Sequence, residues 1–208
     1  MARLHKSDTS NASFTMHDLV QPIVFVVDMV NGFVKEGALH DDAIQVLIEP
    51  IQQLLNKLQC RSIFVADSHP PMAKEFDAFP KHCVIGTSES EIVDGLKSYA
   101  YEVIHKNSTN TFLAPDFQLF LKERLQDYQD IIICGCCSDI CIMQFALCLQ
   151  AYINEHNLSQ RVIVCSDLIE TYHIDQVHDA YAYNQFAIDV MKASGILVIN
   201  NILEGELS

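Results

Sequence analysis

Three of the chain's eight cysteines lie within the segment GCCSDIC, residues 135–141. Cys141 follows the apolar run 130–135 at the predicted start of a helix, where unpaired backbone amides carry partial positive charge and stabilise a thiolate. Cys136 and Cys137 lie in the turn before it, where we expect backbone rather than side chains to face a substrate. The segment therefore predicts one nucleophile, Cys141; the alternative is that Cys141 is another buried, inert thiol.

The remaining patterns of cysteine chemistry fit the sequence poorly. The spacing C-C-x3-C is not usual for structural zinc, and no second C-x-x-C pair follows it. Uneven clustering in apolar runs argues against a disulfide framework. Cys134 and Cys165 lie inside predicted strands and Cys148 lies two helical turns after Cys141, so we expect all three in the core.

A thiolate nucleophile needs a base and a group that balances its charge. Asp28 ends the apolar run 23–28, where burial would raise its pKa into a useful range. Lys106 ends the run 101–106 and could pair with both the carboxylate and the thiolate. We therefore expect Asp28, Lys106 and Cys141 to act together.

A second group has the chemistry of a divalent-metal site. Asp67 and His69 are two residues apart at the end of the run 62–67, so they can point the same way, and His82 follows in the next loop. Neutral imidazoles and a carboxylate suit zinc, iron or manganese. The alternative is a solvated loop rich in histidine and carboxylates.

The elements that must position these residues are short apolar runs alternating with amphipathic segments. Continuous Val/Ile runs indicate strands buried on both faces, and the repeated alternation indicates a parallel sheet. We predict a single-domain α/β fold with three layers, α/β/α, around a mainly parallel six-stranded sheet; its strand order is not predicted. The carboxyl ends of such strands form the ligand-binding edge. The predicted strands are 23–28, 62–67, 101–106, 130–135, 161–167 and 195–200, and the predicted helices are 41–59, 87–98, 116–127, 139–156 and 175–194.

Composition limits the class of protein. At 208 residues and 50 % hydrophobic, the chain suits one core, with residues 1–20 as a polar, mobile arm and 21–208 as the domain. No apolar stretch approaches the about 18 residues of a membrane span, and no signal peptide is expected. The net charge of −14 argues against nucleic acid or an anionic membrane as partner. We expect a soluble cytoplasmic protein with reduced cysteines.

From about residue 23 to residue 199, the chain resembles the isochorismatase-like cysteine hydrolases. Asp28 in VVDMVNGF, Lys106 in HKNSTNTF and Cys141 in GCCSDIC match the Asp–Lys–Cys triad of that superfamily. Within it, the chain looks most like nicotinamidases, whose G-x-x-[TS]-D-x-C-[VI], D-x-H-P and aromatic-P-x-H-C motifs are met at 135–142, 67–70 and 79–83.

The resemblance implies further roles. It places Glu75 as a fourth metal ligand beside open coordination positions, and it places the oxyanion hole at the backbone amides of Cys137 and Cys141, after a cis Cys136–Cys137 peptide. Phe79 stands where nicotinamidases usually have tryptophan, which this chain lacks, and could sandwich a flat ring with Phe33.

The implied activity is metal-dependent hydrolysis of a small aromatic or heteroaromatic primary amide, such as nicotinamide, through a thioester. One divalent metal, zinc first and iron or manganese next, would hold the substrate's ring, and a homo-oligomer is expected. The alternatives are hydrolysis of another C–N bond, such as a carbamoyl or ureido group, and a non-catalytic ligand-binding member of the fold. His40, His105, His173 and His178 receive no role; His178 is expected on the last helix, at the surface or packed.

Overall fold

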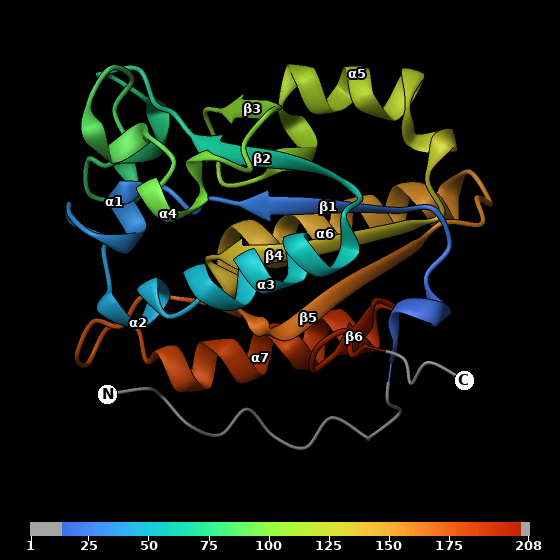
Figure 1. The fold of residues 1–208 in the computed structure, drawn as a ribbon. Helices are drawn as coiled ribbons and strands as arrows, with labels where there is room; N and C mark the ends of the chain where they lie inside the picture. The colour runs from blue at the N-terminus through green and yellow to red at the C-terminus, as the bar shows by residue number, and fades with distance from the viewer. Residues whose placement is uncertain (1–13, 205–208) are drawn as a thin grey trace.

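The computed structural model describes residues 14–204, which form a parallel sheet between two layers of helices (Figure 1). Six strands are hydrogen-bonded in the order β3-β2-β1-β4-β5-β6, and every neighbouring pair is parallel. This confirms the predicted three-layer α/β architecture. The strands are β1 Pro22–Val27, β2 Arg61–Asp67, β3 Val103–Lys106, β4 Asp130–Cys136, β5 Arg161–Glu170 and β6 Leu197–Ile199.

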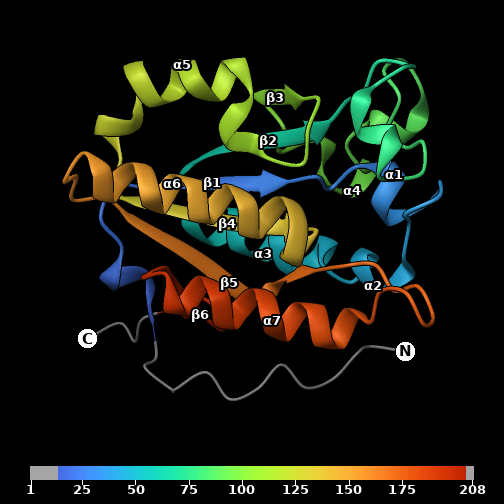
Figure 2. The ribbon, with the colours of Figure 1, turned by 180° about the vertical axis from the view of Figure 1, so that it is seen from behind.

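A different set of helices covers each face of the sheet. Helices α1 to α4 share a core with one face of the sheet, and α5 to α7 share a core with the other face (Figure 2). The α-helices are α1 Asn31–Val34, α2 Asp42–Gln45, α3 Ile48–Leu58, α4 Asp94–Lys97, α5 Pro115–Glu123, α6 Met143–Glu155 and α7 Ala180–Ala193. Short 3-10 turns cover Met16–Asp18, Lys74–Asp77, Ser88–Ser90, Thr111–Leu113 and Leu125–Asp127, and a π-helical turn covers Ser138–Ile142.

The apolar runs become strands because both faces of the sheet are covered. Successive residues of β1 alternate between the two cores: Val24 packs on the α3 side, and Phe25 on the α5–α7 side. The ring of Phe25 makes edge-to-face contacts with Phe117, Phe120 and Phe145, at centroid distances of 5.6, 5.3 and 5.5 Å. This aromatic cluster ties α5 and α6 to the middle of the sheet.

The strand order brings β1 and β4 together at the centre. The chain first adds β2 and β3 on one side of β1, then returns to add β4, β5 and β6 on the other. The point where the order reverses is the favoured ligand position in open α/β sheets. Gly135 near the end of β4 allows this close pairing, because its φ is +111° and a Cβ there would lie 2.0 Å from the carbonyl oxygen of Val27.

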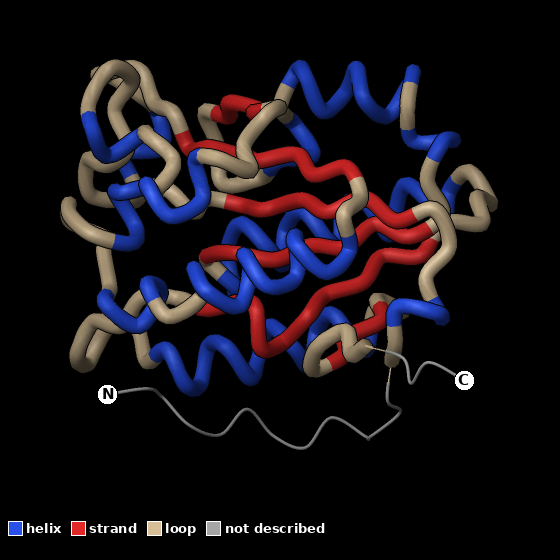
Figure 3. Tube along the Cα trace, viewed as in Figure 1, coloured by secondary structure: helices blue, strands red, loops and turns tan. Residues whose placement is uncertain are grey.

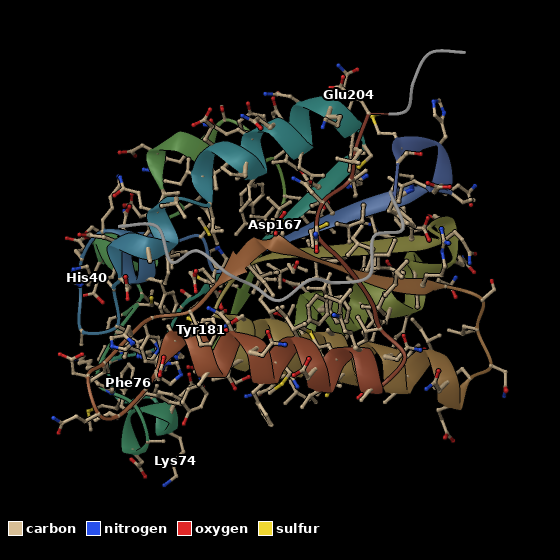
Figure 4. The ribbon with its side chains drawn as sticks, turned by 90° about the horizontal axis from the view of Figure 1, so that it is seen from below. His40, Lys74, Phe76, Asp167, Tyr181 and Glu204 are labelled. Atoms are coloured by element: carbon tan, nitrogen blue, oxygen red, sulfur yellow. The ribbon has the colours of Figure 1, made fainter. Side chains whose placement is uncertain are left out.

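The loops that leave the carboxyl ends of the strands gather at one end of the molecule, on the left of Figure 3. Figure 4 shows Phe76 and Tyr181 at this same end, and Glu204 well away from them. The candidate site residues therefore come from one rim of the sheet.

Several predicted helix boundaries are wrong. The segment 87–98 is not one helix but two short helical turns, Ser88–Ser90 and α4, and the apolar residues Ile92 and Val93 between them are buried without a helix. The segment 41–59 breaks into α2 and α3. The last helix begins at Ala180 rather than 175, because the Asp179 side chain caps it by accepting hydrogen bonds from the Tyr181 and Ala182 amides.

Residues 1–13 of the predicted polar arm lie outside the described residues. The part that is described packs on the body: Phe14, Met16 and Leu19 contact the α3-side core, and the Met16 amide donates to the Leu203 carbonyl at 3.0 Å. A boundary at residue 20 stays a prediction. No helix within residues 14–204 is both long and apolar enough to cross a membrane.

Candidate active site

The three residues predicted to form a catalytic triad come together at the carboxyl ends of the strands. Lys106 ends β3, Asp28 follows β1, and Cys141 lies in the π-helical turn after β4. The Lys106 ammonium lies 2.9 Å from Asp28 Oδ2 and 3.8 Å from the Cys141 thiol. All three side chains are buried. The group is thus shielded from water and organised around one ammonium.

Asp28 is held by its backbone rather than by its carboxylate. Its amide donates to the Val65 carbonyl at 2.9 Å, its carbonyl accepts from the Cys136 thiol at 3.1 Å, and its φ of +52° turns the side chain away from the strand. Although Lys106 lies within ion-pair distance, neither carboxylate oxygen accepts a well-aligned hydrogen bond from a described residue. Oδ2 thus faces the Lys106 ammonium, and Oδ1 has no hydrogen-bond partner among the described residues.

The pKa of Asp28 is raised to about 6, because burial penalises the carboxylate more than Lys106 stabilises it, and Asp67 adds repulsion. This agrees with the expectation from the sequence. A carboxyl with such a pKa is ionised at neutral pH and is basic enough to accept a proton.

The prediction that Cys141 has a lowered pKa is wrong. Burial raises the pKa of its thiol well above the ordinary value; Lys106 opposes this, and the carboxylates of Asp28 and Asp67 reinforce it. The amides of the helix start do not outweigh these effects, since the side chain is enclosed and faces two negative charges. The resting residue is a neutral thiol that requires a base.

The turn that carries Cys141 is fixed at several points. The Cys136–Cys137 peptide is cis, as the family resemblance implies. The carbonyl of Cys137 accepts from the amides of Ile140 and Ile142 at 3.2 and 3.0 Å. The oxyanion hole at the amides of Cys137 and Cys141 stays a prediction.

The predicted metal ligands form one cluster. One ligand atom from each of Asp67, His69, Glu75 and His82 lies within 4.8 Å of all the others. Asp67 Oδ2 is 3.0 Å from His69 Nε2 and 3.2 Å from His82 Nε2. Glu75 Oε1 is 3.7 and 3.9 Å from the same two nitrogens. The other oxygen of Asp67 lies 2.8 Å from Lys106 Nζ, which links the cluster to the triad.

The outward-facing atoms of these ligands are held by further partners. His69 Nδ1 lies 2.9 Å from Asn107 Oδ1, and His82 Nδ1 lies 2.7 Å from the Pro80 carbonyl, so each imidazole turns its Nε2 lone pair into the cluster. Glu75 accepts from the Thr109 amide at 3.0 Å. Sequence reasoning missed Asn107 and Thr109, although both lie in the segment after Lys106.

This cluster fits a divalent cation. His69 Nε2 and Glu75 Oε1 are buried and have no hydrogen-bond partner among the described residues. Two inward-facing imidazole nitrogens with two carboxylates match zinc, iron or manganese. Burial alone would raise the pKa of Asp67, but Lys106 and the two histidines hold it well below the ordinary value. Asp67 is therefore an anionic candidate ligand.

Aromatic rings stand around the cluster. The rings of Phe33 and Phe79 lie 5.6 and 6.3 Å from the ring of His82, so both predicted substrate contacts lie beside the metal ligands. Phe76, which the sequence analysis did not single out, lies 5.3 Å from the ring of His69 and 5.7 Å from that of His82. Its place in the loop with Glu75 and Phe79 could have indicated it.

The fold resembles those of several solved structures. The solved pyrazinamidase of Pyrococcus horikoshii in complex with zinc has the same fold, with a TM-score of 0.70 and 22 % identity over 86 % of this chain and 99 % of that one. The N-carbamoylsarcosine amidase of Thermoplasma acidophilum is also similar, with a TM-score of 0.67 and 23 % identity over 89 % of this chain and 100 % of that one. At these identities the likeness concerns the fold.

Sequence comparison identifies the family to which the chain belongs. The model of the Isochorismatase domain matches residues 22–199, so the chain belongs to the isochorismatase family. Nicotinamidase 1 of Arabidopsis thaliana is 27 % identical in an alignment that covers 85 % of this chain and 84 % of the plant protein.

Proposed function

We propose that this protein is a cysteine amidohydrolase that converts a small heteroaromatic primary amide, such as nicotinamide, into the acid and ammonia. The observation that carries the proposal is the position of Lys106. Its ammonium lies 2.9 Å from Asp28, 2.8 Å from Asp67 and 3.8 Å from Cys141, which joins a base, a thiol and a metal-ligand cluster.

The protonation states support one sequence of steps. Asp28 accepts the proton of the neutral Cys141 thiol as its sulfur attacks the amide carbon. The backbone amides of Cys137 and Cys141 would stabilise the oxyanion. Asp28 then gives the proton to the departing ammonia and leaves a thioester. Asp28 next takes a proton from water, which hydrolyses the thioester, and returns it to the Cys141 sulfur.

Lys106 keeps its charge throughout. Burial would lower the pKa of its ammonium, but Asp28 and Asp67 raise it well above the ordinary value. The cation therefore compensates Asp28 in the resting state and the sulfur once the thiol has lost its proton.

Asp67, His69, Glu75 and His82 would hold a divalent cation. When bound, such a cation supplies a Lewis-acidic contact for a nitrogen of the substrate's ring. Phe33, Phe76 and Phe79 surround the same region and would bind the flat faces of the ring.

The test is ammonia release from matched amides. Nicotinamide and pyrazinamide carry a ring nitrogen, benzamide does not, and an N-carbamoyl amino acid represents the alternative C–N bond. We expect turnover of nicotinamide that is lost on chelation and restored by zinc, iron or manganese, and a much smaller effect of chelation on benzamide. Faster turnover of the N-carbamoyl compound would replace the proposed substrate class, and ammonia from none of them would refute the proposal.

A further inference from the structure

His178 is a buried histidine that the steps above do not use. It lies between β5 and α7, not on the helix where the sequence placed it. Its backbone exchanges two hydrogen bonds with Ile174, at 3.0 and 2.8 Å. Its ring stacks between Tyr172 and Tyr183, at centroid distances of 4.3 and 4.0 Å. The imidazole is therefore fixed in position and orientation.

Both ring nitrogens of His178 face hydrogen-bond acceptors. Nδ1 lies 2.8 Å from the Tyr172 carbonyl oxygen, and Nε2 lies 2.8 Å from Asp139 Oδ2. A neutral imidazole carries one N–H and can serve only one of these acceptors. Both contacts are hydrogen bonds only when both ring nitrogens carry a proton.

Asp139 lies in the turn that carries the thiol, two residues from both Cys137 and Cys141. It is nearly buried at 8 % exposure, and its Oδ1 has no hydrogen-bond partner among the described residues. An uncompensated carboxylate there would oppose negative charge on a thiolate or on a substrate oxyanion. The same turn is also fastened through Ser138, whose hydroxyl lies 2.5 Å from Asn184 Oδ1 on α7.

We propose that His178 is a positioning residue for the amide hydrolysis proposed above. Its imidazolium neutralises Asp139 and holds the turn against the segment between β5 and α7. The amides of Cys137 and Cys141 can then face the developing oxyanion without a competing negative charge. The titratable groups that face the ring are Asp139 on the turn, Tyr172 after β5 and Tyr183 on α7. The inference rests on the proposed function.

The test combines His178→Gln, Asp139→Asn and the double variant, with His173→Gln as the matched control from the exposed part of the same segment. Complete loss of one oxyanion donor costs about 100- to 1,000-fold in rate; because His178 orients the donors rather than supplying one, we expect His178→Gln to lower kcat about 10- to 100-fold with little change in KM. Asp139→Asn added to it should recover at least about fivefold of the loss, because it removes the uncompensated charge. His173→Gln should stay within about twofold of the wild-type rate.

Two readouts do not depend on knowing the substrate. Alkylation of Cys141 by iodoacetamide, followed by mass spectrometry, should slow in His178→Gln and recover in the double variant. Nitrogen NMR of the intact wild-type protein at neutral pH should show both nitrogens of His178 protonated, which decides the matter even where His178→Gln does not fold. A wild-type protein without amidase activity would refute the proposed function while leaving these two tests in force.

Three results would overturn the role of His178. The first is a kcat for folded His178→Gln within about twofold of wild type. The second is a double variant no faster than His178→Gln in both turnover and alkylation. The third is a singly protonated His178 ring at neutral pH.

Discussion

Replacing Lys106 by methionine tests whether this cation keeps Asp28 ionised. The ammonium lies 2.9 Å from Asp28 Oδ2. At an effective dielectric constant of about 20, two unit charges at that separation interact by about 6 kcal/mol. The pKa of Asp28 is already raised to about 6 with the cation in place. If local relaxation leaves half of the interaction, its loss raises that pKa by about two further pH units.

The assay is the pH dependence of kcat/KM for ammonia release. Asp28 works as a base only when deprotonated, so activity is present above its pKa and is lost as pH falls through it. We expect the acid limb of the wild-type protein near pH 6. In Lys106→Met we expect it at about pH 8 or higher, with at least about a tenfold loss at neutral pH from protonation alone.

The control is Lys122→Met, which removes an exposed lysine from α5 and should leave the profile unchanged. Lys106→Met also leaves two buried carboxylates without their partner, which lowers the free energy of unfolding by about 3–5 kcal/mol. Rates are therefore measured below the variant's melting temperature. An acid limb at the wild-type position in folded Lys106→Met would refute the reasoning, because the titrating base would then not be a carboxyl that Lys106 controls.

Three further predictions follow from the same geometry. Cys141→Ala should abolish turnover without lowering metal content, whereas replacing Cys148 of α6 by alanine should leave turnover intact. The opposite result would mean that the nucleophile is misassigned. We expect one divalent ion per chain. In competition with a chelator, His82→Ala should bind the ion much more weakly than wild type, and Asn107→Ala, which frees the outer nitrogen of His69, about 10- to 100-fold more weakly. Unchanged affinity in both variants would place the ion elsewhere. Phe25→Ala should lower the free energy of unfolding by about 3–5 kcal/mol in denaturant titrations, because it empties the centre of a ring cluster; a cost below about 1 kcal/mol would contradict that packing.

The sheet and the main site residues could be predicted because they depend on local patterns. Runs of β-branched residues buried on both faces identify parallel strands, and such strands bring their carboxyl ends to one edge. Asp28, Asp67 and Lys106 each end a run, so their meeting follows from the fold class even without the strand order. The candidate metal ligands are close in sequence, and their residue types suit a divalent cation.

Other features depend on contacts that no local pattern records. The bond between Asn107 and His69 needs the register of β3 on β2, and the pair between His178 and Asp139 joins the turn after β4 to the segment between β5 and α7. The raised pKa of the Cys141 thiol reflects how deeply it is enclosed, which its position at a helix start does not reveal. The apolar spacing of segment 87–98 predicts one helix, but Ile92 and Val93 are buried by the loop between two short helical turns.

The two halves of the site differ in how far apart their residues lie along the chain. All four candidate metal ligands, together with Phe76 and Phe79, fall between residues 67 and 82, whereas Asp28, Lys106 and Cys141 come from three separate strand ends. Contacts of short sequence separation close their loops at low entropic cost, so the ligand loop can form before the sheet is complete, and the triad cannot. The same separation matters for evolution: exchanging the segment 67–82 would replace the candidate metal ligands together with Phe76 and Phe79, while Phe33 and the strand ends that carry Asp28, Lys106 and Cys141 would stay. Most of the proposed substrate contacts can therefore change without altering the three residues proposed to cleave the bond.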